Sequence, residues 1–283
     1  MNILITGSSG FIGTNLVSAL ELKGHKVFHF ESGDGDIADF NFIKKYKEIK
    51  IDYVYHLAGK TFVPDSWDDP SSFFKTNTLG TLNVLKFCDQ RKIPMIFVSA
   101  YVYGNKVSLP ISENSDAQPN NPYALSKYMA ENLCFFYSKF NKLKINIFRP
   151  FNVYGIGQDA RFLIPEILSS VQNNRIIEVN DFFPKRDYIY IDDLVDGLVK
   201  GMEFIDGFEV YNLGSGYSLS VKEIIDIIQK ITNSNLEVIS KESKRANEIN
   251  DVISDISKAK NKLGWHPKFS FEDGIKNILE GKN

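Results

Sequence analysis

The chain has 283 residues, and 33 Lys and Arg against 35 Asp and Glu give it a formal net charge of −2. With 43% hydrophobic and 24% charged residues it has the composition of a globular protein, which excludes a disordered chain, a collagen and a coiled coil. The near-zero charge is unlike that of most nucleic-acid-binding proteins, so we expect no nucleic-acid partner.

The sequence carries no recognisable targeting, membrane or metal-binding signal. It opens on a strand-like run from Met1 to Ile5 without a basic and apolar leader, and no apolar run approaches the ~20 residues that span a bilayer. Cys88 and Cys134 form no CxxC pair, and the four histidines have no metal-ligand spacing. We therefore expect a cytoplasmic protein without membrane contact and without a bound metal.

Short β-branched runs alternate with helical patterns through roughly the first half of the chain. We expect strands at Ile3–Thr6, Lys26–Phe30, Tyr53–Leu57, Met95–Ser99 and Ile145–Arg149. Helices are predicted over Ile12–Lys23 and over Tyr123–Phe140, and the second has one apolar face made of Leu125, Met129, Leu133, Phe136 and Phe140. Strands that alternate with helices imply a doubly wound α/β fold with a parallel sheet.

The pattern loosens after about residue 155, where turn residues interrupt short elements. Helices are predicted there over Asp192–Phe204, with Asp192 and Asp193 as capping residues, and over Val221–Ile231. We expect residues 1–155 to form a cofactor domain to which 186–205 return. Residues 156–185 and 206–283 should form a smaller, mixed α/β portion that caps the sheet and binds the substrate.

A glycine-rich run, Thr6–Gly13, joins the first predicted strand to the first predicted helix. The N-terminus of a helix offers unpaired N–H groups and a partial positive charge to a pyrophosphate, and Gly7, Gly10 and Gly13 let the backbone approach it closely. A packing turn is the structural alternative. The strand before the loop and the helix after it are, however, the context that a Rossmann-type dinucleotide site requires.

Glu31 follows Gly7 by 24 positions, near the place where a carboxylate binds the ribose hydroxyls of NAD. The next residues, Ser32–Asp36, include no Arg or Lys that would neutralise a 2′-phosphate. We therefore expect NAD(H) as the cofactor, with NADP(H) as the alternative. A solvated strand end is the structural alternative for Glu31.

Tyr123 and Lys127 are four residues apart, so on a helix both side chains lie on the same face. A lysine ammonium, together with the positive nicotinamide ring of NAD⁺, favours the phenolate of a neighbouring tyrosine and lowers its pKa, so that the tyrosine can exchange a proton with a substrate oxygen. Tyr46 and Lys50 have the same spacing, and for them we predict only a solvated helix end. Ser99, at the end of a predicted strand, is placed to donate a hydrogen bond to the same oxygen, with a strand-end cap as the alternative.

Several motifs along the chain stand in a familiar order: the TGxxGxxG run at Thr6–Gly13, then His56–Gly59, Asn77, Tyr123–Lys127, Arg149–Asn152 and Arg186–Tyr188. Together they resemble the motifs of the extended short-chain dehydrogenases/reductases, the NAD-dependent epimerase/dehydratase family. The resemblance extends to Leu263–Trp265. The connection after Glu31 is much shorter than in the family's typical epimerases.

The resemblance implies roles for further residues. Besides Tyr123 and Lys127, the cofactor would contact Phe11, Ile12, Asp36, Ile37, Leu57, Ala58, Gly59, Lys60, Asn77 and Pro150, with Asp36 and Ile37 at the adenine. A nucleotide sugar would contact Ser99, Ala100, Tyr101, Asn152, Arg186 and Arg245, the arginines through its phosphates. A surface ion pair is the alternative for each arginine.

The same resemblance narrows the reaction. Family members that dehydrate a sugar carry an Asp-Glu pair directly after the catalytic Ser/Thr, where this chain has Ala100 and Tyr101, so dehydration is not expected. The run Gly59–Trp67 looks most like that of reductases of nucleotide-linked 4-keto-6-deoxyhexoses. Reduction at C4 of such a sugar is therefore the leading expectation, a nucleotide-sugar 4-epimerase is the alternative, and a non-catalytic dinucleotide-binding sensor is a third possibility.

Family members usually form homodimers through the helix that carries the Tyr and Lys and through its neighbour, so the resemblance implies a homodimer. The aromatic residues within Phe73–Phe87 and Phe135–Phe140 are the candidate contacts. A buried core helix is the alternative for both stretches.

Overall fold

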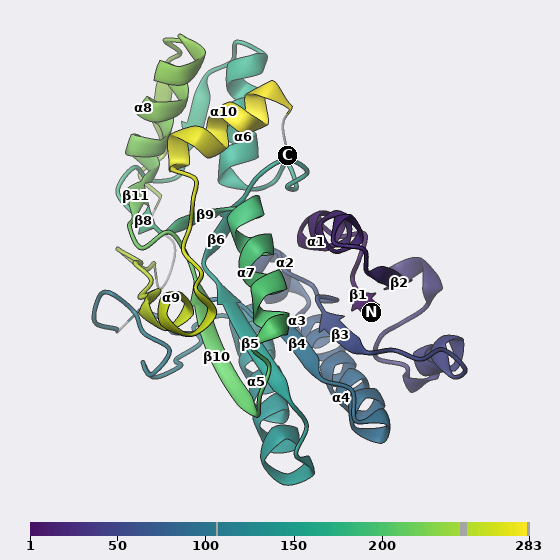
Figure 1. Cartoon of the computed structure of the whole chain (residues 1–283). Coiled ribbons are helices and arrows are strands. Elements are labelled where there is room, and N and C mark those ends of the chain that lie inside the picture. Colours follow the sequence, from purple (N-terminus) through teal and green to yellow (C-terminus); the bar gives the residue numbers. More distant parts are fainter. Residues whose placement is uncertain (106, 244–247, 282–283) are drawn as a thin grey trace.

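The computed structural model describes residues 1–105, 107–243 and 248–281. Its centre is a six-stranded parallel sheet with the strand order β10-β5-β4-β3-β1-β2 (Figure 1). The strands are β1 (Asn2–Thr6), β2 (Lys26–Phe30), β3 (Tyr53–His56), β4 (Met95–Val98), β5 (Ile145–Pro150) and β10 (Phe208–Leu213). The five strands predicted for the first half of the chain are thus confirmed to within one residue at each end.

Both faces of this sheet are buried, as in other doubly wound sheets. Successive side chains of a strand point to opposite faces, and β1 shows the result. Ile3 and Ile5 join a core cluster that contains Leu16, whereas Leu4, between them, joins a second cluster that contains Val84. The predicted doubly wound α/β fold is confirmed.

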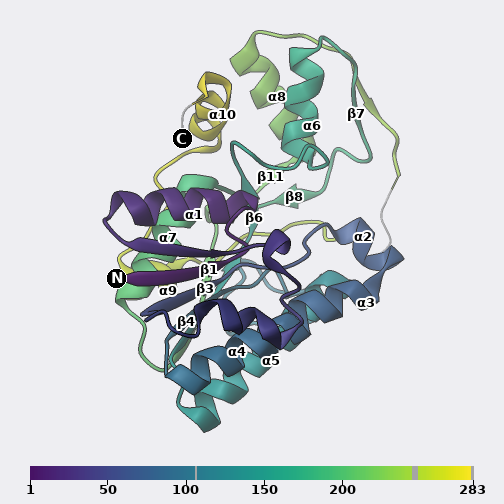
Figure 2. The same ribbon diagram turned by 90° about the vertical axis from the view of Figure 1, so that its right-hand side faces the viewer.

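Helices cover the two faces as separate layers (Figure 2). On one face α1 (Phe11–Leu22) packs against α7 (Ile191–Glu203), and α9 (Ser257–Leu263) lies beside α7 and β10. On the other face lie α4 (Gly80–Arg91) and α5 (Pro122–Asn141). The predicted helices correspond to α1, α5, α7 and α8, with bounds that differ by one residue at most ends.

Short helical segments link these layers. Two 3-10 segments, Ser32–Asp34 and Phe40–Tyr46, lie between β2 and β3. Between β3 and α4 the chain forms α2 (Val63–Asp68), α3 (Pro70–Phe73) and a π-helical segment, Phe74–Leu79.

A smaller group of elements lies over one end of the sheet, at the top of Figure 1. Its helices are α6 (Leu163–Gln172), α8 (Val221–Thr232) and α10 (Phe271–Glu280). Its three two-stranded sheets pair β6 (Asn152–Tyr154) with β9 (Tyr188–Tyr190), β7 (Ile177–Val179) with β12 (Val238–Ser240), and β8 (Lys185–Arg186) with β11 (Leu219–Ser220). One core cluster runs from α1 into these helices, so the two parts share apolar packing.

The structure corrects one part of the expected domain division. The sequence predicts residues 206–283 in the capping portion, but β10 is the edge strand of the main sheet, paired with β5 from Phe208↔Ile145 to Leu213↔Pro150. An edge strand is buried less evenly than a central one, and the first half of β10 is only half-buried. Its short sequence therefore gave no sign of which sheet it joins.

The paired residues Tyr46 and Lys50 do not form the predicted solvated helix end. Tyr46 is buried, in the same core cluster as Ile51 and Val54, and its hydroxyl donates a hydrogen bond to the carbonyl oxygen of His29. The prediction was wrong for Tyr46 because its phenol packs beneath the sheet, although Lys50 is exposed.

Asp193 is not a capping residue either. The residue before the first turn of α7 is Tyr190, and no side chain caps this helix end. The buried Asp193 carboxylate instead accepts hydrogen bonds from the backbone N–H groups of Lys268, at 2.8 Å, and Phe269, at 3.1 Å. It fastens the segment before α10 to α7, a long-range contact that local spacing does not reveal.

Most of the apolar face predicted for α5 points to solvent, and of its five residues only Leu133 packs partly buried against the core. Met129, Phe135, Phe136 and Phe140 are exposed, the last of them to 63%. Phe73 and Phe87, in the other stretch expected to form a dimer contact, are buried in the fold. Among the described residues, no helix combines the length and apolarity needed to span a bilayer.

Candidate active site

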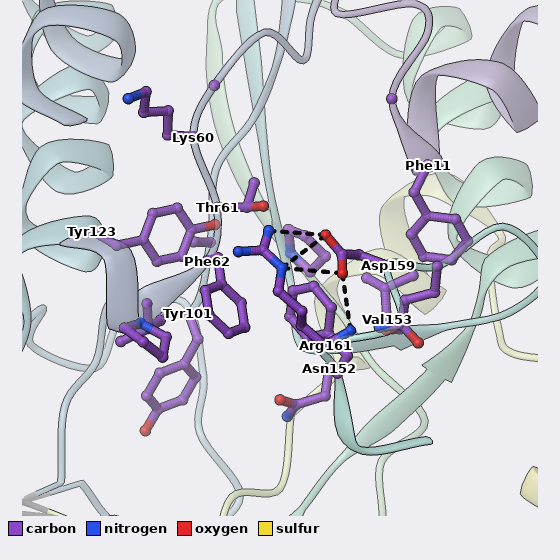
Figure 3. Close-up of a pocket in the computed structure, with 18 of the residues that line it drawn as sticks. Phe11, Lys60, Thr61, Phe62, Tyr101, Tyr123, Asn152, Val153, Asp159 and Arg161 are labelled. Carbon is purple, nitrogen blue, oxygen red and sulfur yellow. Dashed lines mark hydrogen bonds and ion pairs between the residues drawn. The ribbon is translucent and has the colours of Figure 1, made fainter. Parts of the chain in front are cut away.

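A cleft of about 1980 Å³ lies between the sheet and the smaller group of elements, where the loops after β1, β3, β4 and β5 meet (Figure 3). The strand order changes direction around β1, because β2 lies on one side of it and β3 on the other. Open parallel sheets bind their ligands at such a switch point, beyond the carboxyl ends of the strands.

The glycine loop presents the N-terminus of α1 to this cleft. Gly10 precedes the first turn of α1, and no side chain caps that end. Gly7 has φ +76°, and a Cβ there would lie 2.7 Å from the Ala58 backbone nitrogen. A Cβ at Gly13 would lie 2.2 Å from the Gly7 carbonyl oxygen. Both positions therefore require glycine, and the uncapped N–H groups suit a pyrophosphate.

Nearly all residues expected at the cofactor line the cleft. They are Gly7, Gly10, Phe11, Ile12, Gly13, Glu31, Asp36, Ile37, Leu57, Ala58, Gly59, Lys60, Tyr123, Lys127 and Pro150. Asn77 is the exception, because it is buried behind the cleft wall. It accepts a hydrogen bond from Lys60 N at 2.8 Å and donates to Lys60 O at 3.1 Å and to Ser126 Oγ at 2.9 Å.

At the end of the cleft that carries Glu31 and Asp36, other side chains of the protein already contact both carboxylates. Glu31 lies directly after β2 and accepts a hydrogen bond of 2.9 Å from Ser8 Oγ. Asp36 pairs with Lys75 at 2.7 Å, and the hydrogen bond from Lys75 lowers the pKa of the Asp36 carboxyl. Lys75 also lines the cleft. The run Ser32–Asp36 contains no Lys or Arg, but Lys75 of the π-helical segment lies beside Asp36.

Tyr123, Lys127 and Ser99 lie on the same cleft, as expected. Tyr123 projects into it from the first turn of α5 (Figure 3). Lys127, one turn further on, is buried and donates a hydrogen bond of 2.6 Å to the carbonyl oxygen of Val98. Ser99 directly follows Val98, and its buried Oγ has no hydrogen-bond partner within the described part of the chain.

Burial controls the protonation of this group. It raises the pKa of Tyr123, and it lowers the pKa of Lys127 to about 8, against the opposing charge of Glu131. The residues of the chain, without a bound cofactor, therefore do not lower the pKa of Tyr123. At neutral pH the site holds a protonated phenol beside a largely protonated lysine.

The expected substrate residues lie towards the smaller portion. Ala100, Tyr101, Asn152 and Arg186 line the cleft. The guanidinium of Arg186 forms an ion pair with Glu248 and donates hydrogen bonds to the carbonyl oxygens of Ile249 and Lys185. Arg245 lies outside the described residues.

A cluster at the rim of the cleft was not predicted from the sequence. The guanidinium of Arg161 pairs with Asp159 at 2.9 Å, and its Cζ lies 4.1 Å from the centre of the Phe62 ring (Figure 3). It also pairs with Asp65 at 3.2 Å. Asp65 belongs to α2, whereas Asp159 and Arg161 precede α6. Only the short spacing of Asp159 and Arg161 was visible in the sequence, since the contacts to Phe62 and Asp65 span about a hundred residues.

No histidine is among the described residues that line the cleft. His56 is buried between the hydroxyls of Thr6, at 2.7 Å, and Thr81, at 2.9 Å, and burial lowers its pKa to about 3. The neutral ring is therefore a structural link between β1, β3 and α4. Among the described residues, no group of three or more His, Cys, Asp or Glu could hold a metal ion.

The fold and the glycine loop together define a Rossmann-type dinucleotide-binding protein. Residues 3–214 match the NAD dependent epimerase/dehydratase family, and the chain belongs to that family, the extended short-chain dehydrogenases/reductases. The resemblance inferred from the motifs is therefore confirmed.

Similar proteins carry several different activities in their names. A GDP-6-deoxy-D-talose 4-dehydrogenase of Aggregatibacter actinomycetemcomitans is 32% identical, over 99% of this chain and 96% of its own. A GDP-6-deoxy-D-mannose reductase of Pseudomonas aeruginosa is 30% identical, over 98% of this chain and 95% of its own. A dTDP-D-glucose 4,6-dehydratase of Mus musculus is also 30% identical, over 98% of this chain and 87% of its own.

Two solved structures are similar over the whole chain. A UDP-glucose 4-epimerase of Thermotoga maritima, with UDP-glucose, has a TM-score of 0.93 and 29% identity and covers 99% of this chain and 98% of its own. The protein RMD of Pseudomonas aeruginosa, complexed with NADPH, has a TM-score of 0.90 and 28% identity over 99% and 97%. A similar structure, the UDP-glucose 4-epimerase of Thermus thermophilus, is complexed with NAD. Structures similar to this chain thus contain either NAD or NADPH.

Proposed function

We propose that the protein reduces the C4 carbonyl of a nucleoside-diphosphate-4-keto-6-deoxyhexose, with NADH as the cofactor. The observation that carries this proposal is the group formed by Tyr123, Lys127 and Ser99 on one cleft. The buried Ser99 hydroxyl has no hydrogen-bond partner among the described residues, and a substrate oxygen would supply one.

The cleft fits a dinucleotide. The uncapped N-terminus of α1 would hold the pyrophosphate, Glu31 the adenosine ribose, and Asp36 and Ile37 the adenine. When bound, NADH supplies the hydride for C4. Glu31 supports NADH over NADPH, because its carboxylate repels a 2′-phosphate. Lys75 does not offset this repulsion while it is paired with Asp36.

Three side chains would protonate and orient the substrate oxygen at C4 or support that proton transfer. Tyr123 stays protonated at neutral pH, because burial raises its pKa, and so serves as the proton donor for O4. Ser99 would donate a hydrogen bond to the carbonyl and orient it. Lys127 would hold the nicotinamide ribose and favour the phenolate left after proton transfer, while Val98 fixes the place of its ammonium.

The rest of the cleft supports a deoxy sugar linked to a diphosphate. Phe62, Val63 and Trp67 give it an apolar wall that suits a methyl group at C6. Ala100 stands where a dehydratase would need an acid or a base, which supports reduction although a dehydratase is among the relatives. The names of the two GDP-sugar relatives make a GDP-sugar the first substrate to test.

The second candidate is 4-epimerisation of a nucleotide sugar. The similarity to the Thermotoga maritima epimerase supports it, and the same tyrosine, lysine and serine would act first as a base and then as an acid. An epimerase keeps its cofactor through the cycle, whereas a reductase consumes NADH in proportion to its product.

The test is incubation of the purified protein with NADH and GDP-, UDP- or dTDP-linked 4-keto-6-deoxyhexose. Loss of NADH absorbance equal to the sugar reduced is the expected result. Turnover of a saturated nucleotide sugar without added cofactor would instead establish the epimerase. Binding of the dinucleotide without any turnover would establish the sensor, and release of water from a 6-hydroxy sugar would establish a dehydratase.

A further inference from the structure

We propose that Arg149 and Glu131, a buried ion pair behind the cleft, form a positioning pair that holds the Ser99 segment against α5 and balances the charge beside Lys127. This inference rests on the proposed roles of Tyr123 and Lys127. It assigns a task to two residues that do not line the cleft.

The pair is tightly made and almost fully buried. The side chains of Arg149 and Glu131 are 8% and 5% exposed. Arg149 Nε lies 3.0 Å from Glu131 Oε1, and Arg149 Nη2 lies 2.5 Å from Oε2. This two-pronged, charge-assisted contact fixes both orientation and distance, so it joins the end of β5 rigidly to the middle of α5.

A second arm of the guanidinium reaches the segment that carries Ser99. Arg149 Nη1 donates a hydrogen bond of 2.9 Å to the hydroxyl of Tyr103, which lies four residues after Ser99 and is fully buried. The Tyr103 hydroxyl in turn donates to Asn212 Oδ1 at 2.6 Å. One guanidinium therefore links α5, β5, the segment after β4 and β10.

The pair also sets the charge around Lys127. The titratable groups around that lysine and the ion pair are Tyr123, Glu131 and Cys134 on α5, Arg149 on β5, His56 on β3, Cys88 on α4 behind Cys134, and the buried, neutral phenol of Tyr103 after β4. Burial keeps His56 and both thiols neutral. The remaining charges are those of Lys127, Glu131 and Arg149, so removal of either partner changes the local net charge by one unit.

Because the two partners have opposite charges, their single variants should move the pH profile in opposite directions. In Glu131→Gln the unbalanced Arg149 charge favours loss of protons from Lys127 and Tyr123. The alkaline limb of kcat/KM for reduction should then move down by about one pH unit. In Arg149→Met the unbalanced carboxylate retains those protons, and the limb should move up by a similar amount. A merely structural role would move neither limb.

The controls separate charge from stability. Ile145→Ala, at the start of β5, removes buried apolar volume without removing charge, so it should lower Tm and leave the pH profile in place. The double variant Glu131→Leu, Arg149→Met removes both charges, and its limb should lie between those of the single variants. If one single variant fails to fold, the other single variant and the double variant still test the sign.

Two results would be decisive against this inference. Limbs that stay within about 0.2 pH units of the wild-type limb, or that move in the same direction in both single variants, would overturn it. Tyr123→Phe distinguishes that outcome from failure of the proposed function. If Tyr123→Phe remains active, the catalytic assignment itself is wrong; if it is inactive and the limbs do not move, only the role of the pair is wrong.

Discussion

The ammonium of Lys127 donates a hydrogen bond of 2.6 Å to the carbonyl oxygen of Val98, the residue directly before Ser99. This contact joins α5 to the end of β4, and it brings the lysine and the serine to the same point from segments 29 residues apart. It also holds a charged group in a buried place, where its desolvation is only partly offset.

The first prediction concerns the cost of burying that charge. Burial lowers the pKa of Lys127 to about 8, so the folded chain binds this proton less tightly than the unfolded chain does. Lys127→Met should therefore raise the free energy of unfolding at pH 7, by roughly 2–3 kcal/mol, while it abolishes turnover. Urea unfolding measures the first effect and the NADH assay the second.

The pH dependence of this gain has a definite sign. Below pH 8 Lys127 is protonated in both the folded and the unfolded wild type, so Lys127→Met should raise the free energy of unfolding by its full amount. It should shrink as the pH rises towards 10.5, where the unfolded lysine also loses its proton. A Met variant that is less stable than wild type at pH 7 would show that the ammonium is well compensated in the fold.

The second prediction tests the proton donor. Tyr123→Phe removes the hydroxyl but keeps the ring, so kcat should fall by at least about a hundredfold while the Kd for NADH changes little. Tyr137→Phe makes the same change on the same helix, outside the cleft, and should retain activity. Comparable activity in the two variants would reject the assignment of Tyr123.

The third prediction concerns the rim of the cleft. Arg161 joins α2 to the segment before α6 through Asp65 and Asp159 and lies over Phe62. Arg161→Met removes both ion pairs, so we expect the two walls to separate more readily and KM for the nucleotide sugar to rise about five- to tenfold, with kcat little changed.

The control for this rim is an exposed arginine elsewhere. Arg175→Met replaces such a residue outside the cleft and should leave KM unchanged. Because salt weakens ion pairs near solvent, the difference in KM between wild type and Arg161→Met should become smaller at high ionic strength. A KM equal to that of wild type at low salt would mean that the rim contacts play no part in binding.

The fourth prediction concerns the choice of cofactor. Glu31→Ala removes the carboxylate held by Ser8, and with it the repulsion of a 2′-phosphate. The ratio of kcat/KM for NADH over NADPH should fall by about tenfold or more. Glu21→Ala, an exposed change on α1, should leave the ratio as it is. A wild-type protein that already prefers NADPH would contradict the proposed role of Glu31.

The fifth prediction concerns assembly. The exposed apolar face of α5, with Met129, Phe136 and Phe140, supports a homodimer formed through this helix, because burial of such a face against a second copy is favourable. Phe136→Glu should convert a dimer to monomers in sedimentation at micromolar concentration. Leu22→Glu, equally apolar and more exposed on α1, should not. A monomeric wild type would exclude the dimer.

The strands, the glycine loop and the helix that carries Tyr123 and Lys127 were predictable because their signals are local. β1 to β5 are short apolar runs between turn residues, and Gly7 and Gly13 mark places where a Cβ would collide with backbone. The spacing of Tyr123 and Lys127 fixes a shared helix face wherever the helix lies. The motif order added the family, which local patterns alone do not give.

Other features depended on contacts between distant segments, and these only the folded chain shows. Tyr46 and Lys50 repeat the spacing of Tyr123 and Lys127, yet packing against the sheet buries Tyr46 as a core residue. Asp193 binds backbone groups 75 and 76 residues away instead of capping its helix.

By itself, therefore, the sequence determined the parallel α/β fold, the glycine loop and the shared face of Tyr123 and Lys127, because backbone sterics and helix period act between near neighbours. The tertiary structure decided that β10 completes the main sheet, that Arg161 reaches Asp65 and that Arg149 lies against Glu131. Strand pairing and ion pairing at these places join segments whose separation along the chain carries no local signal. Their partners are selected by shape and burial once the sheet has formed.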